Sequence, residues 1–209
     1  MICNCPRGAA LPDVPISECP ENFGQIQKVA FQRLTKADGT KNAIAAPKVK
    51  ASWTPLLVAA DDTKVVMSPY IQAPTAEAGA PKEEGGGNES LGGIPEIVGR
   101  EATPFTGVIR KSAQSTIKAL KGLQCEAMGV YLFDENGAIG CINAGTVEAP
   151  VYRPIPIRSF FVGDKTFGGF EKSDTNAIQW SFLPNYSDNF VMLAPTDFNP
   201  LTDLVVAEA

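Results

Sequence analysis

The chain has 209 residues, a hydrophobic fraction of 44%, a formal net charge of −5 and no histidine. This length suits one globular domain, or one domain with appendages, that folds without disulfide bonds. The acidic balance argues against tight binding to a phosphate backbone, and the lack of histidine argues against hydrolase or oxidoreductase chemistry.

The first 22 residues hold four prolines and three of the five cysteines. Proline removes a backbone donor and restrains the residue before it, so residues 1–22 are predicted to form an extended arm. Cys3, Cys5 and Cys19 are weak candidates for a zinc site, because their spacing lacks a nearby fourth ligand. The alternative is that these cysteines are small apolar side chains in an arm that docks on a neighbour.

Partial alternation of apolar and polar residues from Phe23 to Phe31 favours a strand. The stretch "KADGTKNA" is typical of a turn centred on Asp38 and Gly39. Residues 46–70 mix lysine, proline and β-branched residues. We expect them to be irregular, with one strand near residues 63–67.

Residues 73–99 are predicted to form a long flexible loop, because six glycines lie between Gly79 and Gly93. Loops of this length in compact domains are usually functional or disordered. The stretch "GGGNESLGG" is rich in glycine like a phosphate-binding loop, but it lacks the GK[ST] ending and the strand-to-helix context of such loops.

The remaining pattern predicts a strand in residues 100–111 and a helix over 112–124 that is capped by Ser112. Asn136 and Gly137 predict a type I′ hairpin turn, and Gly163 and Asp164 predict another turn. Further strands are predicted at 157–162, 177–183 and 190–194, with a further segment at 166–171. Cys125 and Cys141 have no imidazole beside them to act as a base, so core packing is the expected role of both.

Together these elements predict a mainly β (α+β) fold, a β-sandwich or barrel with one flanking helix, a long Gly-rich loop and extended termini. The domain is expected to span residues 23–194. Residues 195–209 are predicted to form an extended C-terminal tail, in which Phe198, Leu201 and Leu204 are apolar anchors. Asp197, Asn199 and Asp203 could bind a hard cation, but the EF-hand spacing is absent and turn formation is the better interpretation.

The segments "CNCPRGAALPDVPISECPENFGQIQKVAFQRL" and "IQWSFLPNYSDNFVMLAPTDFNPLTDL" resemble virion structural proteins of tailed phages that infect Bacteroidales. The helix over 112–124 and the hairpin over 131–142 are similar to those of a tail-tube-like domain. The resemblance is to ring and tail-tube-like proteins of the crAss-like group.

This resemblance implies a ring of the tail tube or of the head-to-tail barrel around a DNA channel. Expected partners are copies of the chain, adjacent virion ring, portal or tail proteins, and genomic DNA that passes without specific binding. No membrane, cofactor, metal or catalytic residue is expected. The expected location is the virion, after assembly in the host cytoplasm. The assembly arms would then use Cys3, Cys5, Cys19, Phe23, Phe198, Leu201 and Leu204.

Two other classes of function stay open. The chain could be a Cys-rich metal-binding or partner-binding β module of bacterial origin, and about one zinc per chain would favour that alternative. An enzyme is the weakest hypothesis, because no nucleophile has a neighbouring base in the sequence pattern.

Overall fold

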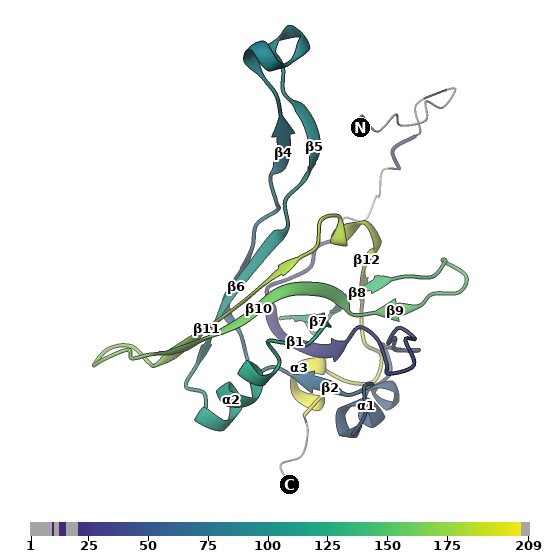
Figure 1. Ribbon diagram of the computed structural model, residues 1–209. Helices are drawn as coiled ribbons and strands as arrows, with labels where there is room; N and C mark the ends of the chain where they lie inside the picture. The colour runs from purple at the N-terminus through teal and green to yellow at the C-terminus, as the bar shows by residue number, and fades with distance from the viewer. Residues whose placement is uncertain (1–9, 11–12, 16–20, 206–209) are drawn as a thin grey trace.

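A computed structural model describes residues 10, 13–15 and 21–205, and within them strands dominate (Figure 1). The strands are β1 (Ile26–Arg33), β2 (Val65–Met67), β3 (Gln72–Ala76), β4 (Pro81–Glu84), β5 (Glu96–Arg100), β6 (Thr103–Arg110), β7 (Met128–Asp134), β8 (Ile139–Asn143), β9 (Tyr152–Arg153), β10 (Ile155–Thr166), β11 (Thr175–Phe182) and β12 (Phe190–Leu193). The α-helices are α1 (Thr54–Val58), α2 (Gln114–Gly122) and α3 (Pro200–Asp203), and the 3-10 helices are η1 (Lys50–Ser52), η2 (Gly87–Glu89), η3 (Leu91–Gly93) and η4 (Tyr186–Asn189). The predicted mainly β fold is confirmed.

Ten strands pair antiparallel in the order β12-β8-β7-β10-β11-β6-β3, with β1 along the other edge of β7, β2 beside β1, and β9 beside β8. Strand β10 pairs with β7 only through Ile155 and Pro156, and then pairs with β11 along its remaining length. Early in the β10–β11 pairing, between Arg158 and Phe161, a shift of register marks a β-bulge, and Ser159 within it has a φ of +55°. Because a bulge bends its strand, β10 can pass from one half of the sheet to the other.

Two apolar clusters lie on opposite faces of β1 and β7. Val130 and Leu132 of β7 belong to the first cluster, and Tyr131 and Phe133 belong to the second, so β7 is buried on both faces. The first cluster is completed by β6, β10, β11 and α2. The second is covered by the segment around Trp53 and by the segment after β12, which includes the buried Leu204.

The predicted helix is α2, whose Ile117 and Leu120 are buried in the first cluster. It begins at Gln114, and Ala113 is its N-cap without a side-chain bond, so the predicted Ser112 cap is wrong. The predicted β7–β8 hairpin is confirmed, but its turn is not type I′. Of the turn residues only Gly137 has a positive φ, +80°, and its N–H donates to the Asp134 carbonyl at 3.0 Å, as in a type I turn that is followed by a left-handed glycine.

The predicted turn at Gly163 and Asp164 is wrong, because β10 continues to Thr166 and the chain reverses between residues 167 and 174. A Cβ on Gly163 would lie 3.5 Å from the Cβ of Ala177 on the paired strand β11. This distance is an ordinary van der Waals contact, so the strand has room for a side chain at this position and the glycine does not mark a turn.

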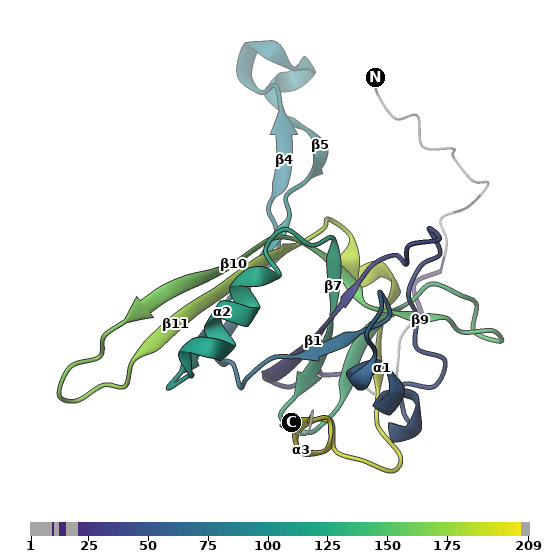
Figure 2. The same ribbon diagram turned by 60° about the horizontal axis from the view of Figure 1, so that its bottom comes forward.

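The segment 73–99 is not a structureless loop. It holds all of β3 except its first residue, all of β4 and most of β5. Strands β4 and β5 pair as a separate two-stranded ribbon that projects from the body (Figures 1 and 2). Every residue of β4 is exposed, as are all but one of β5. Because neither face is buried, no apolar alternation marks these strands in the sequence.

The C-terminal segment is also more ordered than expected. Residues Pro200–Asp203 form the one-turn helix α3, and Leu204, which is 1% exposed, packs into the second cluster of its own chain. The domain therefore extends past the predicted boundary at residue 194, and the prediction of an extended tail is wrong for this part. No helix in the described ranges is long and apolar enough to cross a membrane.

Candidate assembly surfaces

Two segments project from the body of the molecule (Figures 1 and 2). They carry six of the fourteen large apolar side chains that are exposed in the described residues. We call residues 77–101 the arm and residues 163–175, the far end of the β10–β11 pair, the ribbon end. The exposed apolar residues of these two segments are Leu91, Ile94, Ile97 and Val98 on the arm and Phe167 and Phe170 on the ribbon end. Exposed apolar groups that cluster in this way mark sites of contact with other molecules.

The arm has no core of its own. Strands β4 and β5 pair only with each other, with a shift of register between Lys82 and Glu83. At the base, Glu101 N donates to the Ala80 carbonyl at 2.9 Å, and at the tip Gly86 N donates to Ser90 Oγ at 2.6 Å. An isolated two-stranded hairpin is marginally stable in water, so this ribbon gains stability where a partner covers one of its faces.

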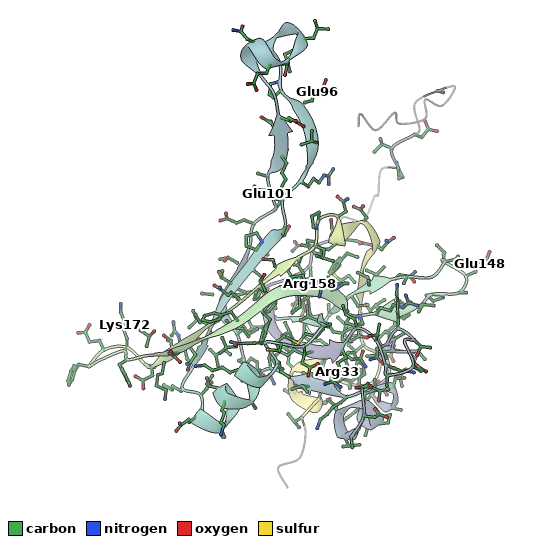
Figure 3. All side chains as sticks on the ribbon, viewed as in Figure 1. Arg33, Glu96, Glu101, Glu148, Arg158 and Lys172 are labelled. Atoms are coloured by element: carbon green, nitrogen blue, oxygen red, sulfur yellow. The ribbon has the colours of Figure 1, made fainter. Side chains whose placement is uncertain are left out.

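Most of the net charge of the chain lies on the arm. Residues 77–101 contain six glutamates and two basic residues, a net charge of −4 out of −5 for the whole chain. The body and the ribbon end together are therefore close to neutral. Figure 3 shows Glu96 and Glu101 on the arm, far from Lys172 on the other projection.

A groove at the ribbon end has the opposite charge. Arg110, Lys111, Lys172 and the carboxylate of Glu171 line it, together with Phe167. The pairing of Arg110 with Thr175 brings the end of β6 beside β11, and Lys111 N donates to the Asp174 carbonyl at 3.1 Å. Three cations from two distant parts of the sequence thus meet beside the exposed Phe167.

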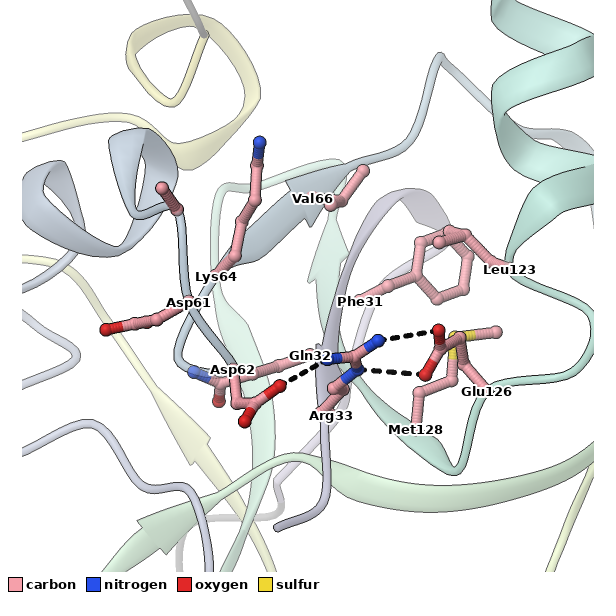
Figure 4. Close-up of a pocket in the computed structure, with 11 residues that line it drawn as sticks. Phe31, Gln32, Arg33, Asp61, Asp62, Lys64, Val66, Leu123, Glu126 and Met128 are labelled. Carbon is pink, nitrogen blue, oxygen red and sulfur yellow. Dashed lines mark hydrogen bonds and ion pairs between the residues drawn. The ribbon is translucent and has the colours of Figure 1, made fainter. Parts of the chain in front are cut away.

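A pocket of about 260 Å³ lies between β1, the turn before β2 and the segment after α2 (Figure 4). Arg33 forms a two-pronged pair with Glu126, with Nε 2.8 Å from Oε2 and Nη2 2.7 Å from Oε1, and its Nη1 pairs with Asp62. Arg33 lowers the pKa of Glu126 by hydrogen bonding, and its own pKa is raised by the two acidic partners. Because the central charges are already paired, the arrangement fits a clamp between three segments better than a reactive centre.

The predicted site residues are spread over several places. Cys3, Cys5 and Cys19 lie outside the described residues. Phe23 packs edge to face on Phe190, with ring centroids 5.6 Å apart. Phe198 and Leu201 are half-buried against the second cluster, which already contains Leu204.

The structure also places the two remaining cysteines and the polar C-terminal residues that were considered as cation ligands. Cys141 is fully buried, as predicted, and burial raises the pKa of its thiol to about 12. Cys125 is exposed, so the prediction that it packs in the core is wrong. Asp197 accepts a hydrogen bond from Lys50 N at 3.0 Å, and Asn199 accepts one from Leu201 N at 2.9 Å. Among the residues that the structure describes, no three acidic or cysteine side chains are grouped as metal ligands.

Lys28 makes a structural contact whose partner the sequence pattern did not indicate. Its side chain is buried to 8% exposure, and its Nζ donates to the Leu201 carbonyl at 2.6 Å and lies 4.2 Å from the centre of the Tyr70 ring. Burial lowers the pKa of this lysine. The contact fastens α3 to β1, and a basic residue in an alternating strand was the only signal for it.

No family model matches this sequence, and no curated protein sequence matches it. Among solved structures, a chain of the anti-feeding prophage baseplate, determined by cryo-EM with six-fold symmetry, is similar in part. Its TM-score is 0.30 at 11% identity, over 85% of this chain and 98% of that chain. A TM-score of this size does not establish a shared fold or a shared role.

Proposed function

We propose that this chain is a structural subunit of a tailed-phage virion, which assembles with copies of itself into a ring of the tail tube or of the head-to-tail barrel. The ring would enclose a DNA channel and contact an adjacent ring, portal or tail protein. The chain would act through its shape, without a catalytic residue or a cofactor, and would be located in the virion.

The observation that carries this proposal is the position of the exposed apolar residues. Six of the fourteen large apolar side chains that are exposed in the described residues lie on the arm and on the ribbon end. Both segments extend away from the body. A monomer gains nothing from apolar groups held in water at the ends of thin ribbons. Copies that cover these ribbons for one another would remove that surface from water.

The free edges of the sheet favour a closed arrangement. In the described part of the chain, β3 pairs only with β6 and β12 pairs only with β8, so the order of strands ends on two open edges. Open edges invite pairing with another chain, and head-to-tail contacts between identical subunits form a ring when the rotation closes. A net charge of −5 suits a wall that DNA passes without being held.

The test compares the mass of the wild-type chain with that of arm variants by light scattering over a range of concentrations. We expect the wild type to form species well above the monomer mass of 22.2 kDa. Replacing Ile97 and Val98 with serine should weaken this association, because both side chains are exposed in the single chain and available to a partner.

The matched control is Val58→Ser on α1, because Val58 and Ile97 are 71% and 70% exposed in the single chain. This variant should assemble as the wild type does. All variants should unfold at the wild-type urea concentration, since none loses a buried contact. A wild type that stays monomeric, or an arm variant that assembles normally, contradicts the proposal.

A further inference from the structure

We propose that the acidic arm of one copy docks in the basic groove at the ribbon end of another copy. This inference rests on the proposed self-assembly and names the two surfaces that would meet. It follows from the charge of the two projections, their exposed apolar residues and their directions.

The two surfaces carry opposite charges. The arm carries six glutamates and two basic residues, whereas Arg110, Lys111 and Lys172 face the single carboxylate of Glu171 in the groove. None of these three cations forms an ion pair within the described residues. Two nearby carboxylates are already paired, Asp164 with Lys121 and Asp174 with Lys165, so the groove keeps a net positive charge.

The apolar residues match as well. Phe167 and Phe170 lie exposed on the ribbon end, and Ile97 and Val98 lie exposed on β5 of the arm. Exposed ion pairs alone contribute little to affinity, so the apolar contact would supply most of it. The charges would select the partner surface and speed the encounter.

The arm of one chain does not dock in the groove of the same chain. Figures 1 and 2 show the arm and the ribbon end leaving the body in different directions. The groove must therefore receive the arm of a second copy. Because the two surfaces differ, the contact is head-to-tail, which produces a ring or a filament rather than a two-fold dimer.

Nucleic acid is the other chemical class that a basic groove with aromatic residues can hold. The observations favour the arm, because Glu171 lies within the groove and the chain as a whole has a net charge of −5. Both features repel a phosphate backbone.

The test is a charge exchange between the two surfaces, measured as the association constant in sedimentation velocity. The arm variant is Glu83→Lys with Glu84→Lys, and the groove variant is Arg110→Glu with Lys172→Glu. Each variant alone should associate about tenfold or more weakly than the wild type. The arm variant places three consecutive lysines, at positions 82–84 of β4, opposite the basic groove, and the groove variant places three glutamates opposite the acidic arm. An equal mixture of the two should recover association, since the lysines of the variant β4 then meet the acidic groove and the unchanged acidic arm meets the unchanged basic groove.

The matched control for the groove variant is Lys41→Glu with Lys48→Glu, which also replaces two basic residues with glutamate, but at exposed positions of the body. It should associate as the wild type does, and circular dichroism should report the same fold for every variant. If the wild type assembles and the reversals change nothing, or the mixture does not recover, the docking inference is wrong and the proposed function stands. If the wild type never assembles, the proposed function fails first. Binding of a labelled oligonucleotide that is lost in the groove variant would also overturn the inference.

Discussion

Single side chains set the ends of strands in this protein, and Asp134 is the clearest case. It is 1% exposed at the end of β7, and its Oδ1 accepts hydrogen bonds from Asn136 N at 3.0 Å and Ala138 N at 2.7 Å. Its Oδ2 accepts one from Gly24 N at 3.0 Å. One carboxylate therefore closes the β7–β8 turn and fixes the segment before β1.

Replacing Asp134 with alanine should destabilise the fold by about 2–4 kcal/mol, because it leaves three backbone donors without a partner. Urea unfolding followed by circular dichroism measures this loss. Asp38 is the control, since its Oδ1 also accepts from a backbone N–H, that of Thr40, at 2.8 Å, but on the exposed surface. Asp38→Ala should cost clearly less, and equal losses for the two variants would refute this account of the turn.

Residue patterns predicted where turns fall better than how they are built. Asn136 and Gly137 placed the β7–β8 turn correctly, but Asp134 decides its type through hydrogen bonds that the dipeptide does not specify. Lys28 is a similar case. Its partner, the Leu201 carbonyl, lies 173 residues away in the sequence, and no local pattern predicts such a contact.

Strands were predictable where one face is buried and the other is exposed. In β6, Thr103, Phe105, Gly107 and Ile109 are buried in strict alternation, and β11 repeats this pattern. Strands β4 and β5 lack any buried face, so the glycine content of the segment dominated the prediction of a loop. Helix α1 has only five residues, too few for a helical period to emerge.

The arm should therefore open more easily than any other strand pair. In hydrogen exchange of the unassembled chain, amides of β4 and β5 should exchange far faster than those of β6 and β11, because local stability follows buried contacts. At concentrations where the chain assembles, exchange in β5 should slow. Fast exchange in β6, or protection of β5 in the monomer, would contradict this view of the arm.

At the scale of the whole molecule, the sequence indicated a mainly β domain but not its extent. The second cluster joins Ile44, Trp53 and Leu204, which meet only in the folded chain. The boundary at residue 194 was wrong for this reason, since Leu204 packs on the domain that the prediction ended before it.

Of the two candidate surfaces, one was predictable from the sequence and the other was not. The arm was predictable as a long segment with an unusual composition. The basic groove was not, because Arg110 and Lys172 come together only through the pairing of β6 with β11. Such surfaces depend on strand register, which the sequence specifies only through long-range packing.

Negative-stain electron microscopy of the purified full chain tests the central claim most directly. We predict annuli of uniform diameter that become more numerous with concentration and stack into short tubes, because projecting ribbons and open sheet edges would then be covered by other copies. Dispersed single chains at every concentration, with no annuli, would contradict the claim that this protein works by assembling with itself.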